Sequence, residues 1–413
     1  MQSLNLIKPK KETSWGAIWS LTIGVAGLII AEFLPAGVLT PMAHDLGVTE
    51  GMAGQAVSAS AIFATVTSLS IAYLTRKLDR KFVAVTLTGF LTCSSVVVAT
   101  AHSYTFLLLG RVLLGIAVGG FWSLSSAIAI RLVEPEEVPK AMSLIYGGSS
   151  FASVLAAPMG SYLGNLIGWR NVFFIAAAVG VAAFVWQLIT LPSLTPIGTT
   201  KLRTTIDVLR KPRFIIALFA INFVFCGRFA SFTYLRPFLE QTTHLNVNWI
   251  SAVLLIFGLS YFVGNWFAPG MIKRNIRTAL IFPPAILAFV ALGLLLAGQW
   301  LIPTLIFVFI WGSSFGPVAP SWSTWVSRSV PEFLETAGGL YIASIQLAAT
   351  VGALFGGVVF DRFGSSGVFI LSGISWLMSA TLVSLFITNP SESKSAENGA
   401  SITSHDLNRS TSL

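Results

Sequence analysis

The sequence predicts an all-α polytopic membrane protein with twelve transmembrane helices, and three observations carry this prediction. Of the 413 residues, 54% are hydrophobic and only 10% are Asp, Glu, Lys or Arg, whereas soluble domains contain about 25% charged residues. The apolar residues form runs of about 20, the length that crosses a bilayer as a helix. Lys and Arg gather in alternate loops between these runs, as topology rules require of cytoplasmic loops.

Twelve apolar runs define the expected helices. They are placed at 17–40, 53–75, 83–101, 104–130, 140–163, 170–191, 213–236, 248–270, 278–297, 300–326, 336–360 and 366–388. No small-residue cleavage site follows the first run, so we expect a retained helix rather than a signal peptide.

The expected loops give the chain an orientation. Basic residues cluster before the first run, after the second, fourth, eighth and tenth, between the sixth and seventh, and in the tail. The opposite loops contain Arg170, Arg236 and Arg362. Because Lys and Arg stay on the cytoplasmic side, both termini are expected in the cytoplasm.

The same pattern divides the chain into five segments. We expect a cytoplasmic N-terminal segment at 1–16, a six-helix half at 17–191, a linker at 192–212, a second six-helix half at 213–388 and a tail at 389–413. The tail is rich in Ser, Thr and Asn, a composition typical of disorder.

Composition also excludes several functions. The net charge of +9 is spread over short loops, which argues for topology rather than nucleic-acid binding. Cys93 and Cys226 both lie in apolar runs, so no disulfide framework or metal cluster is expected. No G-x-x-x-x-G-K-[ST] loop is present, which argues against ATP-driven transport. We expect no cofactor and no enzymatic activity, and we expect a monomer whose partners are the lipid bilayer, protons and a small-molecule substrate.

Three charged residues lie deep inside the expected helices: Glu32, Arg111 and Arg228. Each is seven residues from the outer end of its helix, which at 1.5 Å per residue places it about 10 Å below that end. Charges in membrane spans are costly and usually serve a function. All three are therefore expected at the same depth below the outer ends of their helices.

The two halves of the chain show signs of a duplication. The first and seventh runs align without gaps, as do the fourth and tenth, in the manner of repeats within transporter folds. The aligned residues are Glu32 and Arg228, Thr40 and Arg236, and Trp122 and Trp322.

Short motifs then point to a family. The stretch GRVLLGIAVGG (110–120) has an Arg followed four residues later by Gly. The stretch AYLTRKLDRK (72–81) keeps the closing Arg80-Lys81 of a second motif but departs from it at Arg76, where the motif has Asp, and at Asp79, where it has Gly. The stretch SVLAAPMGSYLG (153–164) keeps Pro and Gly at helix-5 motif positions. With these motifs the chain resembles a major facilitator transporter of the bacterial drug/proton antiporter type.

Further stretches resemble the bacterial purine nucleoside exporters of that family. They are AEFLPAGVLTPMAHDLGVTEGMAGQ (31–55), GGFWSLSSAIAIRLV (119–133), VPKAMSLIYG (138–147), GWRNVFF (168–174), FTYLRP (232–237) and SWSTW (321–325). The resemblance implies proton antiport by alternating access in the inner membrane, with export of purine ribonucleosides such as inosine and guanosine. Sugar or multidrug efflux by the same mechanism is the alternative. An intramembrane enzyme or a nutrient receptor would need a catalytic set or a signalling domain that the sequence lacks.

The resemblance also implies roles for the deep charges, because helices 1, 4, 7 and 10 of the family line a central cavity. Glu32 would carry the proton with Arg111 beside it, or the two would form a structural ion pair that joins helix 1 to helix 4. Arg228 would bind an anionic group, balance Glu32 or donate to a carbonyl such as a purine O6.

Aromatic and polar residues complete the expected site. Trp122 and Trp322 occupy equivalent places, where an indole could stack on a purine, although most of the 12 Trp residues must only fill space or anchor the membrane interface. The in-span groups able to hydrogen-bond a ribose or base are Asn222, Tyr234, Gln346 and Gln55. The expected gating residues are Pro35 and Gly37, which should loosen helix 1, and Arg80 and Lys81.

Overall fold

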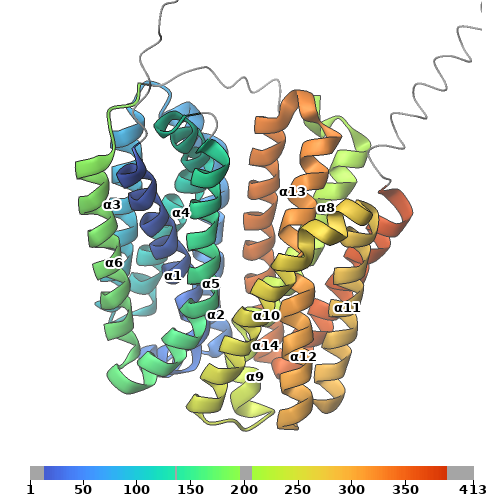
Figure 1. Cartoon of the computed structure of the whole chain (residues 1–413). Coiled ribbons are helices and arrows are strands. Elements are labelled where there is room, and N and C mark those ends of the chain that lie inside the picture. Colours follow the sequence, from blue (N-terminus) through green and yellow to red (C-terminus); the bar gives the residue numbers. More distant parts are fainter. Residues whose placement is uncertain (1–13, 135–136, 196–206, 388–413) are drawn as a thin grey trace, which may run out of the picture. The chain divides into compact units, whose positions relative to one another are not determined.

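The computed structural model describes residues 14–134, 137–195 and 207–387, and these ranges are helical (Figure 1). The expected disordered tail, most of the N-terminal segment and the linker from 196 to 206 lie outside the described residues. The chain forms two compact units. Unit 1 contains 1–200, 233–240 and 245–255, and unit 2 contains 201–232, 241–244 and 256–413.

Unit 1 is built from the first six long helices. They are α1 (Trp15–Leu46), α2 (Glu50–Leu74), α3 (Arg80–Ala99), α4 (Tyr104–Leu132), α5 (Val138–Ile167) and α6 (Trp169–Thr190). Helix α1 packs on α5 and α6, α2 packs on α4, and α3 packs on α4 and α6. Most of the short helix α9 (Leu235–Gln241) and the start of α10 (Val247–Arg274) also belong to this unit.

Unit 2 contains the remaining helices. They are α8 (Pro212–Thr233), the rest of α10, α11 (Ile276–Ala297), α12 (Leu301–Phe315), α13 (Val318–Ser329), the 3₁₀ turn η2 (Pro331–Phe333) and α14 (Leu334–Phe386). Helix α11 packs on both α12 and α14. Aromatic rings fill the interior, where Trp311 lies 6.0 Å from both Phe369 and Trp376 between ring centroids.

Each of the twelve expected spans overlaps helix in the described residues, and the one at 300–326 is divided between α12 and α13 by a turn at 316–317. Within the described residues, ten helical segments are long and apolar enough to cross a membrane. Helix α14 counts once among the ten but breaks at Gly364, whose φ of 65° and ψ of −165° suit glycine, so it supplies two spans. Helix α5 is not among the ten and covers the expected span at 140–163. The expected span at 213–236 divides near Tyr234 into α8 and α9.

Local sequence explains where the helices of unit 1 begin and end. Gly47 closes α1 with a left-handed φ of 64°, and its N–H bonds back to Ala43 and His44. Thr49 then caps α2 by accepting a hydrogen bond from the Met52 N–H. Short caps of this kind let consecutive helices reverse direction within a few residues.

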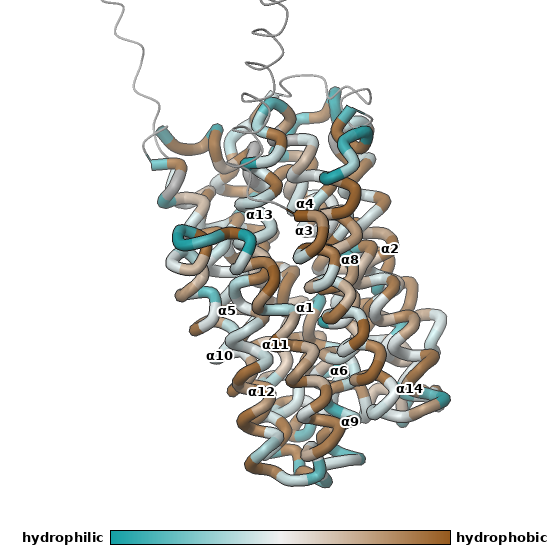
Figure 2. Tube along the Cα trace, turned by 90° about the vertical axis from the view of Figure 1, so that its right-hand side faces the viewer, coloured by the Kyte–Doolittle hydropathy of each residue, from teal (hydrophilic) through white to brown (hydrophobic). Residues whose placement is uncertain are grey.

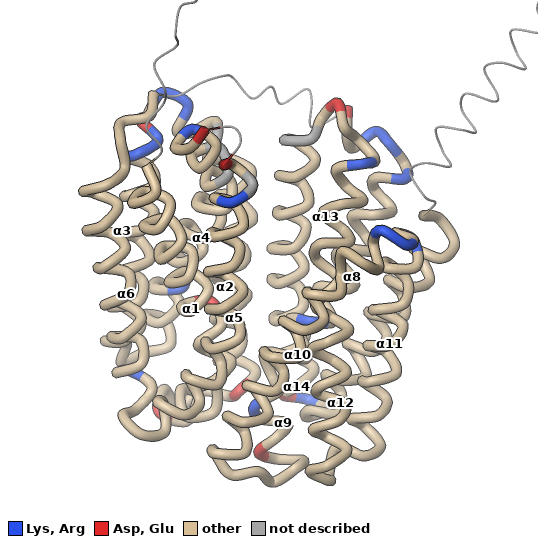
Figure 3. Tube along the Cα trace, in the orientation of Figure 1, with Lys and Arg blue, Asp and Glu red and all other residues tan. Residues whose placement is uncertain are grey.

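The distribution of polarity fits a protein that spans a membrane. Figure 2 shows hydrophobic colour along most of the helices and hydrophilic colour mainly at their ends. Charged residues also gather at helix ends, with few along the helix middles (Figure 3). The few that lie within the helices are therefore the candidates for function.

Candidate functional site

Arg111 lies on α4 in unit 1 and is 1% exposed. Its Nη1 donates to the Ala31 carbonyl at 2.8 Å, its Nη2 reaches the Glu32 carbonyl at 3.4 Å, and its Nε donates to the Ala56 carbonyl at 3.1 Å. Its Nη2 also donates to Ser60 Oγ at 3.2 Å. The guanidinium therefore joins α4 to the backbones of α1 and α2.

The sequence of α1 explains why a donor is needed there. Pro35 has no N–H, so the carbonyl of Ala31, four residues earlier, loses its helical partner. An unsatisfied carbonyl is expensive in a membrane interior. Arg111 replaces the missing N–H, and the small residues of α4 allow it to come close: a Cβ on Gly119 would lie 2.2 Å from the Ala64 carbonyl oxygen of α2.

Glu32 lies on α1 one residue beyond the carbonyl that Arg111 caps, and it is partly exposed. In the described part of the chain, its carboxylate and the Arg111 guanidinium are not joined by an ion pair within 4.0 Å. The ion pair between helices 1 and 4 that the sequence offered as one alternative is therefore not seen in these residues; Arg111 joins the two helices through backbone carbonyls instead.

Arg228 lies on α8 in unit 2 and is 8% exposed. Its guanidinium carbon lies 3.9 Å from the Phe232 ring centroid, 4.9 Å from that of Phe257 and 5.3 Å from that of Phe315. Cations are attracted to ring faces at such distances. An aromatic box therefore surrounds this charge.

The two equivalent tryptophans have different environments. Trp122 on α4 is partly exposed and stacks on Tyr146 of α5, with centroids 5.7 Å apart and planes 23° apart. Trp322 on α13 is 1% exposed and packs edge-on against Trp325 at 5.9 Å. Trp122 therefore presents an accessible indole, whereas Trp322 is packed in the interior of its unit.

The expected polar ligands are scattered over both units. Asn222 Nδ2 donates to Ser344 Oγ at 2.5 Å in unit 2, where Gln346 is also buried. Tyr234 is buried and donates to the Gly51 carbonyl at 3.2 Å in unit 1, where Gln55 is partly exposed on α2.

Helix 1 is irregular where the sequence suggested a gate. Its helical geometry fails at Val38, with φ −122° and ψ 17°, between Pro35 and Pro41. Gly37 serves packing there, because a Cβ would lie 2.2 Å from the Ala157 carbonyl oxygen of α5.

The loop after α2 is tied to the end of α6. Arg80 Nη1 donates to Thr75 Oγ1 at 2.7 Å. Asp79 caps α3 by accepting from the Lys81 N–H at 2.7 Å, and it also accepts from the Ser193 hydroxyl and the Leu194 N–H. Partial burial opposes ionisation of Asp79, but these hydrogen bonds outweigh it and hold the pKa of the carboxyl below its ordinary value.

A cavity of about 840 Å³ opens between α1 and α5 within unit 1. Trp15, Trp19 and Phe151 line it, with Lys140 Nζ lying 4.5 Å from the Trp15 ring centroid. In the described ranges its lining contains none of the residues expected to bind substrate.

Several groups escaped the sequence analysis. The stacking partner Tyr146 and the rings of Phe257 and Phe315 lie in other helices, and sequence spacing gave no signal for them. Arg236 is expected from the sequence in a loop opposite the cytoplasmic side, and this placement is wrong. It lies in α9, is 5% exposed and forms an ion pair with Glu240 at 2.8 Å. Their spacing of four residues on one helix was the signal that could have found this pair.

Known proteins share both the sequence pattern and the fold. The family model described as Major Facilitator Superfamily matches residues 21–341. The purine ribonucleoside efflux pump NepI of Escherichia coli (strain K12) is 43% identical over 370 residues, which cover 90% of this chain and 93% of the pump.

Two solved structures show the same fold at low identity. A D-xylose-proton symporter matches with a TM-score of 0.77 and 14% identity over 92% of this chain and 99% of its own. A bacterial homolog of the human lysosomal transporter Spinster matches with a TM-score of 0.72 and 15% identity, over 89% and 95%. The expected fold class is confirmed. This chain is a multi-pass membrane protein and not an enzyme, and it belongs to the major facilitator superfamily of transporters.

Proposed function

We propose that this chain is a proton-coupled antiporter that exports purine ribonucleosides, such as inosine and guanosine, from the bacterial cytoplasm by alternating access. The observation that carries this proposal is the 43% identity, over 90% of the chain, to a pump of that name. In the proposed arrangement the protein lies in the inner membrane with both termini in the cytoplasm. Two six-helix halves, 17–191 and 213–388, alternate the access of a central site.

Glu32 is the proposed proton carrier. The geometry around it supports this role, because Arg111 fixes the backbone at Ala31 and Glu32 through hydrogen bonds, while no ion pair within 4.0 Å joins the two charged groups in the described chain. The carboxyl can then gain or lose a proton without breaking the bonds that join α1 to α4. A proton carrier needs this arrangement, in which the hydrogen bonds that join the helices do not involve the carboxyl that exchanges the proton.

The proposed substrate groups suit a purine nucleoside. Trp122 offers a partly exposed ring for stacking, and the Arg228 guanidinium can donate to a purine carbonyl. The groups proposed to bind the ribose or base are Asn222, Tyr234, Gln346 and Gln55, with Trp322 as a second, more deeply buried ring. The gating roles of Pro35, Gly37, Arg80 and Lys81 are likewise proposals.

Replacement of the carboxyl tests the coupling. In inside-out vesicles, Glu32→Gln should abolish inosine uptake driven by a pH gradient but permit downhill exchange of labelled for unlabelled inosine, because only proton transfer is lost. Glu332→Gln, at an exposed acidic residue of η2, is the matched control and should retain both activities. Gradient-driven uptake by Glu32→Gln would remove Glu32 from the mechanism.

A comparison of substrates tests the assignment. The same vesicles are given labelled inosine, adenosine, arabinose and a lipophilic cation under one pH gradient. Uptake of the purine ribonucleosides supports the proposal. Uptake of arabinose alone would indicate a sugar exporter, and uptake of the cation alone a multidrug exporter.

A further inference from the structure

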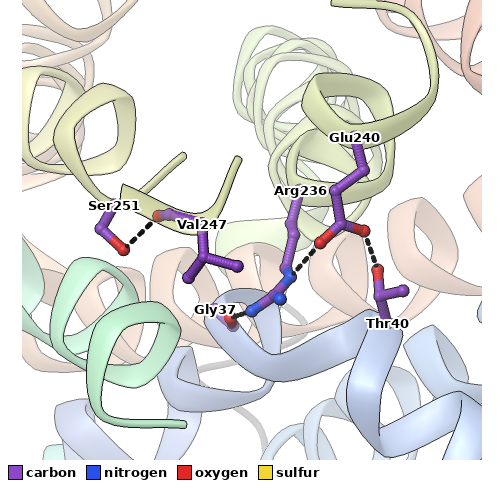
Figure 4. Close-up of polar contacts among 6 residues, drawn as sticks. All are labelled: Gly37, Thr40, Arg236, Glu240, Val247 and Ser251. Carbon is purple, nitrogen blue, oxygen red and sulfur yellow. Dashed lines mark hydrogen bonds and ion pairs between the residues drawn. The ribbon is translucent and has the colours of Figure 1, made fainter. Parts of the chain in front are cut away.

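Helix α1 contains a second proline, Pro41, and an arginine donates to the carbonyl four residues before it, as at Pro35. Pro41 leaves the Gly37 carbonyl without its helical N–H, as Pro35 does for Ala31. Arg111 caps Ala31 at 2.8 Å, and Arg236 Nη1 donates to the Gly37 carbonyl (Figure 4). Two arginines from distant parts of the sequence thus replace the two amides that α1 lacks.

The outer arginine belongs to a small closed cluster in unit 1. Arg236 Nε donates to Glu240 Oε1 at 2.8 Å, and Glu240 Oε2 accepts from Thr40 Oγ1 at 2.5 Å (Figure 4). Thr40 follows Gly37 by three residues on α1. Helix α9 therefore grips a single turn of α1 at two points, a carbonyl and a hydroxyl. The duplication aligns Arg236 with Thr40, so the cluster joins equivalent ends of the first helix in each half.

The two caps differ in how they could be removed. Arg111 is 1% exposed and carries no carboxylate partner within 4.0 Å in the described chain, so withdrawing it would leave a lone charge in the membrane interior. Arg236 carries its counterion four residues along the same helix. The pair can leave α1 as a neutral unit, and water at the helix end can then satisfy the Gly37 carbonyl and the Thr40 hydroxyl.

The position of residues 233–240 in the chain suggests why the Arg236 cap should be removable. Residues 233–240 belong by sequence to the second half, yet they pack in unit 1, whereas residues 212–232 of α8 pack in unit 2. A transporter whose halves rock against each other must make and break the contacts that the second half forms with the first helix.

We propose that Arg236 and Glu240 form a detachable cap on α1 that closes the outer end of the transport path while docked and opens it when released. These two residues are positioning residues for the transport cycle and do not bind substrate. The inference rests on the proposed transport cycle but not on the identity of the substrate. Arg111, by contrast, stays docked throughout the cycle.

Cross-linking tests whether the cap must detach. In a full-length background with Cys93→Ser and Cys226→Ala, the pair Thr40→Cys and Glu240→Cys is joined by a short bifunctional thiol reagent in proteoliposomes. The unlinked pair is the reference, because it already lacks the contacts of Thr40 and Glu240. Linked protein should lose the transport that the unlinked pair retains and regain it when a cleavable linker is reduced. The matched control pair is Ser20→Cys and Thr190→Cys, whose hydroxyls lie 3.2 Å apart between α1 and α6, and its cross-link should leave transport intact. Full transport by the linked 40–240 pair overturns the proposal.

A second measurement needs no substrate. The rate at which a membrane-impermeant maleimide labels Thr40→Cys reports opening at this end of α1. Arg236→Gln should raise that rate at least about tenfold, because the guanidinium's hydrogen bonds to Glu240 and to the Gly37 carbonyl are both lost. Arg170→Gln is the control, since it removes the ion pair of Arg170 with Asp45 near the same end of α1 and should leave labelling unchanged.

The two measurements separate the cap from the proposed function. Faster labelling in Arg236→Gln, together with no nucleoside transport by the parent protein, would support the proposed cap and contradict the proposed substrate. Nucleoside transport with equal labelling in Arg236→Gln and the parent would reject the cap and retain the substrate.

Discussion

Arg111 and Arg228 are both arginines buried in membrane helices, but they are held by opposite kinds of partner. Arg111 in unit 1 makes hydrogen bonds of 2.8–3.4 Å to three carbonyls and one hydroxyl. Arg228 in unit 2 lies among three phenylalanine rings, with the closest centroid at 3.9 Å. A carbonyl accepts along a defined direction, whereas a ring face attracts a cation over a broad area.

The difference separates two tasks that one residue type can perform. The carbonyl and hydroxyl partners of Arg111 fix the orientation of its guanidinium. The guanidinium in turn fixes the geometry of α1, whose hydrogen bonding a proline interrupts. An aromatic box stabilises the charge but allows it to turn toward a ligand. We therefore expect substitutions at Arg111 to change stability, and substitutions at Arg228 to change transport kinetics.

The largest effect should follow from Arg111→Gln. The shorter amide leaves the Ala31 carbonyl, whose helical donor Pro35 already removes, without any donor, and an unsatisfied buried group costs about 1–3 kcal/mol. It also removes the hydrogen bonds that Arg111 donates to the Ala56 carbonyl and to Ser60 Oγ. A loss of about 3–5 kcal/mol in unfolding free energy is expected, measured by thermal unfolding in detergent with tryptophan fluorescence. Arg111→Lys is the test of shape, because one ammonium cannot serve acceptors on two helices. Normal stability in Arg111→Lys would show that charge alone matters.

A smaller effect on stability, but a clear one on transport, should follow from Arg228→Lys. The charge remains among the rings, so unfolding free energy should change by less than about 1 kcal/mol. The planar fork of donors is lost, so KM for the transported nucleoside should rise about tenfold. Arg213→Lys, at an exposed position on the same helix, controls for the change of side chain. A large loss of stability in Arg228→Lys would contradict the expectation that Arg228, unlike Arg111, affects transport rather than stability.

Removing one wall of the box should have a milder effect. Phe232→Leu retains apolar volume but removes a ring contact worth about 0.5–2 kcal/mol, and the melting temperature should fall less than in Arg111→Gln. Phe219→Leu is the control, because Phe219 on the same helix is 59% exposed. Equal melting temperatures for Phe232→Leu and the parent would show that the ring does not stabilise the charge.

The smallest effect is expected from a charge at a helix end. The pKa of Asp79 is held below its ordinary value, so its ionised form stabilises the fold above about pH 4 and this contribution fades as the pH falls through the lowered pKa. Asp79→Asn keeps an N-cap but removes the charge. Its deficit in melting temperature against the parent should be largest near pH 7 and should shrink as the pH falls below about 4. A deficit that does not vary with pH would assign the whole effect to the cap.

The sequence predicted the fold well because membrane physics leaves few options. A bilayer admits helices of about 20 apolar residues, and the twelve expected spans all overlap helix in the described residues. Cost also made the deep charges conspicuous, so Arg111 and Arg228 were found by sequence alone. Their partners were not found, because Arg111 bonds to backbone carbonyls and Arg228 to phenylalanines. Every residue has a carbonyl, and with 31 Phe residues none stands out.

Arg236 shows a different limit of sequence reasoning. Its position near the end of an apolar run made it look like an ordinary loop cation. Pro41 removes the helical donor for the Gly37 carbonyl, and Arg236, from a distant segment of the chain, replaces that donor. The first step was available from sequence, while the second needed the fold.

The two prolines of α1 also have a consequence during synthesis of the chain, because the donors that replace their missing N–H groups are made later. Helix α1 leaves the ribosome before the helices that supply its two donors, because Arg111 lies 80 residues after Ala31 and Arg236 lies 199 residues after Gly37. At about 5–20 residues per second, the first carbonyl waits about 4–16 s for its donor and the second about 10–40 s. During that interval α1 carries two unsatisfied carbonyls and a carboxylate. The newly made helix should therefore remain in the hydrated channel of the insertion machinery, and it should enter lipid no earlier than α4.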